Sequence, residues 1–159
     1  VIRPPGAIPE EKFTGLCARC GNCVNACPEK IIHHDLGHSG ITGLLTPVIR
    51  FDSKGYCKET CNTCCTVCPT GAIRNLSLEE KFHTTIGSAI IIKKSCLSWD
   101  HNEYCMVCQE YCPYQAIKAV PNKAGVLCPV VDIATCRGCG ICEQVCAAEK
   151  LAIIVQPKT

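Results

Sequence analysis

The cysteines of this chain repeat one spacing four times. Sixteen of the eighteen cysteines form four groups that each end in Cys-x2-Cys-x3-Cys. The groups are Cys17, Cys20, Cys23 and Cys27; Cys57, Cys61, Cys64 and Cys68; Cys96, Cys105, Cys108 and Cys112; and Cys136, Cys139, Cys142 and Cys146. In such a group, three thiolates bind one face of a cubane iron–sulfur cluster and the fourth is directed at a neighbouring cluster. The pattern therefore predicts four [4Fe-4S] clusters held by these sixteen cysteines, and an electron-transfer role for the chain.

The composition agrees with a fold that depends on its metal sites. Cysteine makes up about 11% of the 159 residues, a level typical of cross-linked or metal-bound folds. Aromatic residues account for only 5% of the chain, so we expect no large hydrophobic core. Metal sites rarely exist before the chain folds, so cluster binding contributes directly to the free energy of folding. We expect the cluster-free chain to be largely unfolded.

Charge and hydropathy exclude several classes of partner. The formal net charge of +2 is close to neutral and argues against nucleic acid binding. Four oxidised clusters, each about −2 with its thiolates, would bring the loaded protein to about −6. No apolar run approaches the roughly 20 residues that a membrane helix needs, so we expect no membrane span. With sixteen ligands assigned, no open iron site and no nucleophile–base pair is left, so the chain alone is not expected to be an enzyme.

Short β-rich runs alternate with the cysteine groups. The runs that precede the second, third and fourth groups are 47–51, 90–93 and 130–132. The runs that follow the four groups are 30–32, 71–73, 115–117 and 151–155. A strand, a cysteine loop, a helical turn and a second strand therefore form the repeating unit. We also expect a serine-capped helix at 77–82, and an extended, proline-rich arm at 1–16 that is a candidate partner contact.

The first group with its following proline, Cys-x2-Cys-x2-Cys-x3-Cys-Pro, resembles the motif of bacterial-type ferredoxins. More narrowly, nearly the whole chain is similar to the MauM/NapG family of four-cluster ferredoxin-type proteins. The residues that carry this similarity include the runs Arg3-Pro4-Pro5-Gly6-Ala7, Cys96-Leu97-Ser98-Trp99 and Cys112-Pro113-Tyr114-Gln115-Ala116-Ile117. The resemblance implies an α+β fold over residues 17–159, made of two fused ferredoxin-like dicluster modules with short strands, short helices and long loops.

The resemblance also implies a place and a role in the cell. It predicts an exported, periplasmic polyferredoxin that relays electrons between a membrane quinol-oxidising protein and a terminal reductase or dehydrogenase. Export of the folded protein by a twin-arginine leader would explain why the sequence starts at Val1 without methionine. The alternative is an integral electron-relay subunit of a cytoplasmic molybdenum or tungsten oxidoreductase, or of a hydrogenase-type complex. The chain departs from the family pattern in the extra residue between Cys57 and Cys61, and in Ala147, where a proline is expected.

The motif leaves open which groups exchange their fourth cysteines. A sequential arrangement joins group one with two and group three with four, whereas a nested arrangement joins one with four and two with three. We favour the nested modules, 17–27 with 136–146 and 57–68 with 96–112, because groups two and three share the ending Cys-Pro-x-x-Ala-Ile. The nested ligand sets are Cys17/Cys20/Cys23/Cys146, Cys136/Cys139/Cys142/Cys27, Cys57/Cys61/Cys64/Cys112 and Cys96/Cys105/Cys108/Cys68.

Two cysteines, Cys65 and Cys128, stand outside the groups, and we expect both to be small buried side chains. Zinc is the main structural alternative, but its sites use two separated Cys-x2-Cys pairs rather than three cysteines followed by x3-Cys. Disulfides are disfavoured because cysteines two residues apart rarely satisfy the bond's geometry. The sequence contains no Cys-x-x-Cys-His motif for covalent haem.

Overall fold

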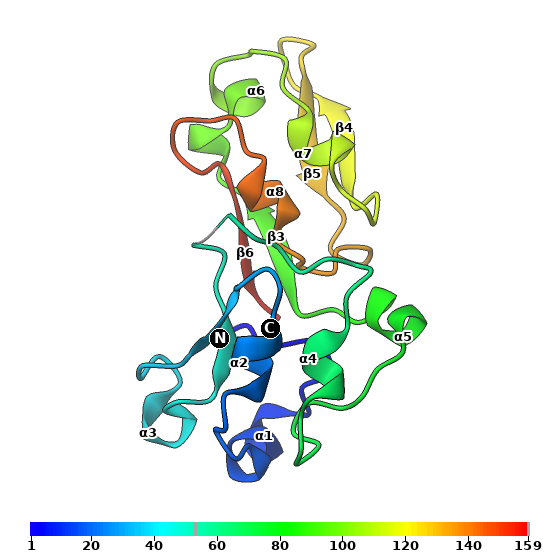
Figure 1. Cartoon of the computed structure of the whole chain (residues 1–159). Coiled ribbons are helices and arrows are strands. Elements are labelled where there is room, and N and C mark those ends of the chain that lie inside the picture. The colour runs from blue at the N-terminus through cyan, green and yellow to red at the C-terminus, as the bar shows by residue number, and fades with distance from the viewer. Residues whose placement is uncertain (53, 159) are drawn as a thin grey trace. The chain divides into compact units, whose positions relative to one another are not determined.

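Short helices and two-stranded antiparallel sheets make up the computed structural model, which describes residues 1–52 and 54–158 (Figure 1). The chain divides into two compact units, unit 1 (Val1–Ile86) and unit 2 (Gly87–Thr159). Over the described residues, one two-stranded sheet belongs to unit 1 and two belong to unit 2. This mixture of helices and small sheets agrees with the predicted α+β class. No helix in the described ranges is both long and apolar enough to cross a membrane.

Unit 1 is organised around one small sheet. Its elements are α1 (Glu10–Leu16), α2 (Asn22–Ala26), β1 (Ile32–His34), α3 (Gly40–Gly43), β2 (Pro47–Ile49), α4 (Thr63–Thr66) and α5 (Leu78–Phe82). Strand β1 pairs antiparallel with β2, with Ile32 opposite Ile49. Ile49 also bridges to Ile2, and Ala7 bridges to Ile73. These pairings bring the segments that follow the first two cysteine groups against the N-terminal segment.

The N-terminal segment, expected as an extended arm at 1–16, is instead packed into unit 1. Its second half forms α1, and the ring of Phe13 is fully buried. The Arg3 guanidinium lies 4.7 Å from the centre of that ring, pairs with the Glu10 carboxylate and donates to the Thr46 hydroxyl at 2.7 Å. Prolines hold the first residues extended, but the apolar and charged side chains among them find partners across the unit. The segment is therefore a structural part of the unit.

The loop between β1 and β2 is held by one buried carboxylate, that of Asp35. Its two oxygens accept hydrogen bonds from the backbone N–H groups of Gly37, His38 and Ser39 at 3.1, 2.8 and 2.8 Å. Burial alone would raise the pKa of Asp35, but these hydrogen bonds and one from the Ser39 side chain outweigh it, so its pKa lies well below the ordinary value. The carboxylate therefore fixes the start of a loop whose end lies beside the first cysteine group.

Unit 2 contains two sheets and several short helices (Figure 1). Its elements are β3 (Gly87–Ile91), η1 (Lys93–Ser95), α6 (Leu97–Asp100), α7 (Val107–Glu110), β4 (Ile117–Pro121), β5 (Leu127–Val131), α8 (Ile141–Gln144) and β6 (Ile153–Pro157). Strand β3 pairs antiparallel with β6, with Ile91 opposite Ile153. Strands β4 and β5 form an antiparallel hairpin. The β3–β6 pair joins the strand before the third cysteine group to the strand after the fourth.

The loop of the fourth cysteine group lies directly against β3. Gly138 has a φ of 71°, and a Cβ atom at this position would come within 2.4 Å of the Gly87 carbonyl oxygen. Only glycine permits both the left-handed backbone and this close approach. Two residues earlier, Cys136 Sγ accepts a hydrogen bond from the Ala89 N–H at 3.4 Å. The strand that leads to the third group therefore also positions the fourth.

Most of the predicted elements are present with shifted ends. The predicted run 90–93 is β3 at Gly87–Ile91, and the run 130–132 overlaps the end of β5. The run 71–73 forms no strand and makes only the single bridge through Ile73. The predicted helix is α5, whose Ser77 hydroxyl accepts the Glu80 N–H while the Glu80 carboxylate accepts the Ser77 N–H. This capping box confirms the predicted helix start.

Candidate iron–sulfur cluster sites

The four cysteine groups share one local structure. In each group the third cysteine lies in a short helix, and the fourth cysteine follows at or just after the end of that helix. The third cysteines and their helices are Cys23 in α2, Cys64 in α4, Cys108 in α7 and Cys142 in α8. In the first and fourth groups the helix is preceded by a left-handed glycine, Gly21 or Gly140. The helix therefore separates the third and fourth sulfur atoms and lets them serve two different sites.

Three cavities are each lined by four cysteines. Site A is lined by Cys17, Cys20, Cys23 and Cys68; site B by Cys27, Cys57, Cys61 and Cys64; site C by Cys96, Cys105, Cys108 and Cys146. Their empty volumes are nearly equal, about 380, 360 and 370 Å³. Each set combines the first three cysteines of one group with the fourth cysteine of the other group in the same unit. This is the exchange that the ferredoxin motif predicts.

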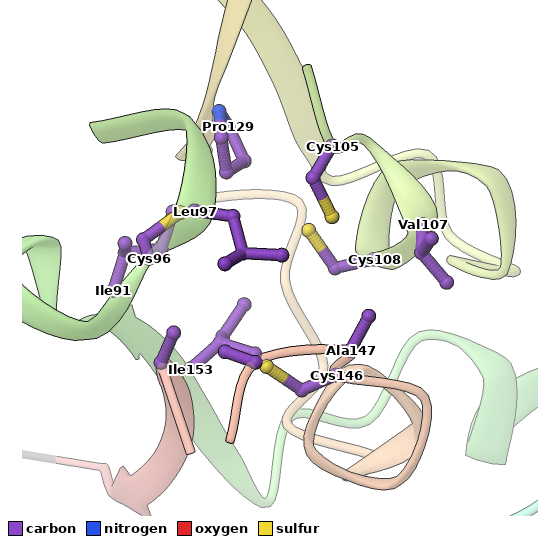
Figure 2. A pocket seen from close by; sticks show the side chains of 12 residues that line it. Ile91, Cys96, Leu97, Cys105, Val107, Cys108, Pro129, Cys146, Ala147 and Ile153 are labelled. Atoms are coloured by element: carbon purple, nitrogen blue, oxygen red, sulfur yellow. The ribbon is translucent and has the colours of Figure 1, made fainter. Parts of the chain in front are cut away.

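Site C shows how the thiols converge (Figure 2). The sulfur atoms of Cys105, Cys108 and Cys146 point toward a common space, to which Leu97 also contributes its side chain. Cys146 reaches this space from the segment after α8, whereas Cys105 and Cys108 come from the segment around α7. Ala147, which replaces the expected proline, also lines the cavity. The alanine in place of the expected proline is therefore part of the wall of site C, and Cys146 still lines the same cavity.

The remaining four predicted ligands also lie in unit 2. Cys136, Cys139 and Cys142 are all buried. Burial raises the pKa of the Cys142 thiol, and the Cys139 and Cys136 thiols raise it further. Cys112 accepts a hydrogen bond from the Ala116 N–H at 3.4 Å. We name Cys112, Cys136, Cys139 and Cys142 site D.

The observed sets differ from the nested arrangement that the sequence led us to favour. Nested pairing required Cys146 with the first group and Cys68 with the third, whereas Cys68 lines site A and Cys146 lines site C. The physical reason is the strand pairing, since β3 joins β6 within unit 2 and Ala7 bridges to Ile73 within unit 1. The shared Cys-Pro-x-x-Ala-Ile ending of groups two and three reflects similar local structure, not mutual contact.

The surroundings of the thiols control their protonation. Burial is the main cause that raises the pKa of Cys23 to about 11 and that of Cys108 to about 12. For Cys68, burial is outweighed by hydrogen bonds from the Ile73 N–H, at 3.4 Å, and from Thr70, so its pKa is lowered. Iron binds the thiolate form, so cluster assembly at the buried positions releases protons. Backbone N–H groups near sulfur also stabilise a negatively charged cluster.

Two cysteines that do not line the three cavities, Cys65 and Cys128, are buried as predicted. Cys65 Sγ donates to the Pro5 carbonyl oxygen at 3.2 Å, although its neighbour Cys64 lines site B. Cys128 Sγ donates to the Ser98 carbonyl oxygen at 3.2 Å. Both side chains therefore have structural contacts of their own. Over the described residues, no three His, Cys, Asp or Glu side chains converge on a point suited to a single metal ion.

Sequence reasoning missed two cations beside the sites. Arg19 lines site A and donates to the Leu44 and Thr42 carbonyl oxygens at 3.0 and 2.7 Å, which ties the β1–β2 loop to the first cysteine group. Its position between two cysteines of the motif was a signal that could have marked it. Lys81 is buried near site B, whereas a lysine in a short capped helix is normally exposed to solvent.

Comparison with known proteins supports the same chemistry. A family model described as a 4Fe-4S binding domain matches residues 11–33. A methylamine utilization ferredoxin-type protein MauM from Methylophilus methylotrophus is 36% identical over 165 residues, which cover 99% of this chain and 71% of that protein. The ferredoxin-type protein NapG of Escherichia coli strain K12 is 35% identical over 167 residues, which cover 98% of this chain and 70% of that protein. The ferredoxin-type protein NapF of Haemophilus influenzae is 31% identical over 153 residues, covering 96% and 78%.

Proposed function

The chain belongs to the MauM/NapG family of ferredoxin-type proteins, and we propose that it is an electron carrier with four [4Fe-4S] clusters, two in each unit. The single observation that carries this proposal is the grouping of twelve cysteines, four by four, around three cavities of nearly equal size. When bound, a cluster of this type takes up and releases one electron without changing its ligands. Every group of this chain has the donor set that such a cluster needs.

The walls of the cavities fit cluster binding in their polarity. Besides cysteines, site C is lined mainly by apolar side chains such as Leu97, Pro129 and Ile153. Site B is lined in the same way, by Ile31 and Ile49 among others. Such walls exclude water from the sulfur atoms, and exposure to solvent is one determinant of cluster potential. We assign all sixteen cysteines of sites A to D as ligands, with site D completed by Cys112.

The four short helices would link the sites in pairs. Helix α2 places Cys23 in site A and Cys27 in site B. Helix α4 likewise places Cys64 in site B and Cys68 in site A. In unit 2, α7 and α8 would link sites C and D in the same way. Each unit is then one dicluster module of the ferredoxin type, with a short covalent path between its two sites. The sequential pairing of groups thus replaces the nested one in this proposal.

The partners follow from the role of a carrier without catalytic residues. We propose that the chain receives electrons from a membrane quinol-oxidising protein and passes them to a terminal reductase or dehydrogenase outside the cytoplasm. The alternative is a relay subunit held permanently in a cytoplasmic molybdenum or tungsten oxidoreductase or a hydrogenase-type complex. A twin-arginine leader encoded upstream of Val1 would favour the first assignment, and a cytoplasmic gene product copurifying with a catalytic subunit would favour the second.

Reductive titration of anaerobically purified protein tests the carrier function. We expect the chain to take up about four electrons, one for each cluster, with paramagnetic signals typical of reduced [4Fe-4S] centres. Reoxidation should restore the starting absorption spectrum, because no ligand changes during the cycle. A protein that takes up no electrons, or that loses its chromophore on the first cycle, would contradict a carrier function.

A further inference from the structure

Lys81 is a buried cation whose charge has no carboxylate partner. Only 2% of the residue is exposed, although lysine is almost never fully buried unless its charge is paired. Arg3, the other buried cation of the described chain, satisfies this rule through its ion pair with Glu10. Across residues 1–52 and 54–158, no carboxylate lies within ion-pair distance of the Lys81 ammonium group. A buried charge of this kind needs a counter-charge from another source.

The contacts of Lys81 lie in the turn between two cysteines of site B. Its Nζ donates to the carbonyl oxygen of Lys58. The same oxygen accepts the N–H of Cys61 at 3.2 Å. Lys58 directly follows Cys57, so this carbonyl belongs to the loop that carries the first two thiols of the second group. The ammonium group is therefore held beside the site rather than beside solvent.

The ammonium group of Lys81 is held at the Cys57 end of this turn, because its acceptor is the carbonyl oxygen of the residue that follows Cys57. The lysine is held in place by α5, whose capping box fixes its first turn. The residue before that cap is also anchored, since the Asn62 amide donates to the Leu76 carbonyl oxygen at 2.7 Å. Lys81 is thus a positioned donor, not a mobile surface side chain.

We propose that Lys81 is the built-in counter-charge of a cluster at site B and makes that site easier to reduce. The inference rests on the proposed function, because it requires a cluster at that site. A fixed positive charge in a low-dielectric environment stabilises the more negative, reduced form. Arg19 beside site A is exposed, so water and salt screen its charge. Within unit 1, the positive charge therefore favours the electron at site B over site A.

Lys58 offers a matched control at the same turn. Its ammonium group lies 2.7 Å from the Glu29 carboxylate, and 45% of its side chain is exposed. Its charge is therefore both paired and screened, although it is attached one residue from Cys57. Removing this charge should leave the reduction equilibria almost unchanged, whereas removing the buried charge should not.

The test compares Lys81→Gln, Lys81→Arg and Lys58→Gln in the full chain, purified without oxygen. Glutamine keeps a donor for the Lys58 carbonyl but has no charge, and arginine keeps the charge. Iron and sulfide per chain are measured first, and the reduction equilibria are then followed by paramagnetic resonance during a redox titration. In K81Q we expect one of the four one-electron equilibria to shift at least tenfold toward the oxidised form, about 59 mV. In K81R and K58Q we expect shifts well below tenfold.

The outcomes separate this inference from the proposed function. A wild-type chain without iron and sulfide would sink the carrier function itself. A fully loaded K81Q with four unchanged equilibria would overturn only the role of Lys81. The same holds if K81Q and K81R shift alike, because the donor geometry and not the charge would then matter. Loss of one cluster from K81Q with full retention in K81R would support the counter-charge role.

Discussion

The double variant Cys20→Ala/Cys68→Ala is expected to bind as much iron as either single variant. Both cysteines line site A, so the second substitution removes a ligand from a cluster that the first has already destroyed. If one cluster is lost cleanly, single and double variants retain about twelve of sixteen iron atoms. The effect is large because a cluster with three protein ligands and no replacement loses its stable coordination.

A crossed pair gives the opposite expectation. In Cys20→Ala/Cys146→Ala the two cysteines belong to sites A and C, so the iron losses of the single variants should add, leaving about eight atoms. Cys20→Ala/Cys61→Ala is the matched control within unit 1, because Cys61 lines site B. Its losses should also add. The nested exchange would give the reverse result. The iron losses would then add in the Cys20/Cys68 variant, and the Cys20/Cys146 variant would lose no more iron than either single variant.

Removal of iron is expected to unfold the chain almost completely. The described sheets have two strands each, and such hairpins are marginal in water by themselves. The longest helix of the described residues, α1, has 7 residues, below the roughly 12 to 15 at which isolated helices become stable. Cysteines are prominent among the buried residues, so an empty site leaves a gap in the core. Circular dichroism and the dispersion of amide proton resonances report the loss directly.

Reconstitution provides the control for this loss. Chelation in the presence of a thiol reductant removes iron without forming disulfides, and addition of iron and sulfide should restore both the spectrum and the cooperative unfolding transition. Urea unfolding of the loaded protein should be irreversible unless iron and sulfide are supplied. An iron-free chain that keeps a dispersed amide spectrum and a cooperative transition would show that side-chain packing alone determines the fold.

The positions of the candidate ligands could be predicted from spacing, but their pairing could not. The x2 and x3 intervals determine which side chains share a loop, and the short helix then separates Cys23 from Cys27. Which loops meet depends on strand contacts such as Ile91 with Ile153. Every one of these runs contains apolar residues, so apolar character alone does not say which of them pair.

The two surprises of unit 1 are also tertiary effects. Prolines near the N-terminus are typical of an extended arm, and the buried hydrogen bond from Arg3 to Thr46 shows that the segment packs into unit 1. Lys81 follows two glutamates in a short helix, a context that normally indicates a solvated face. It is buried because the turn after Cys57 lies over the helix and accepts its hydrogen bond. Neither contact is local in sequence.

The most direct measurement is the amount of iron, acid-labile sulfide and zinc per chain in protein purified without oxygen. Four complete cubanes require about sixteen iron and sixteen sulfide, with no zinc. About twelve of each would mean that one of the four sites holds no complete cluster, and site D would be the first to examine. Stoichiometric zinc without sulfide would contradict the electron-carrier function altogether, because zinc has no redox chemistry.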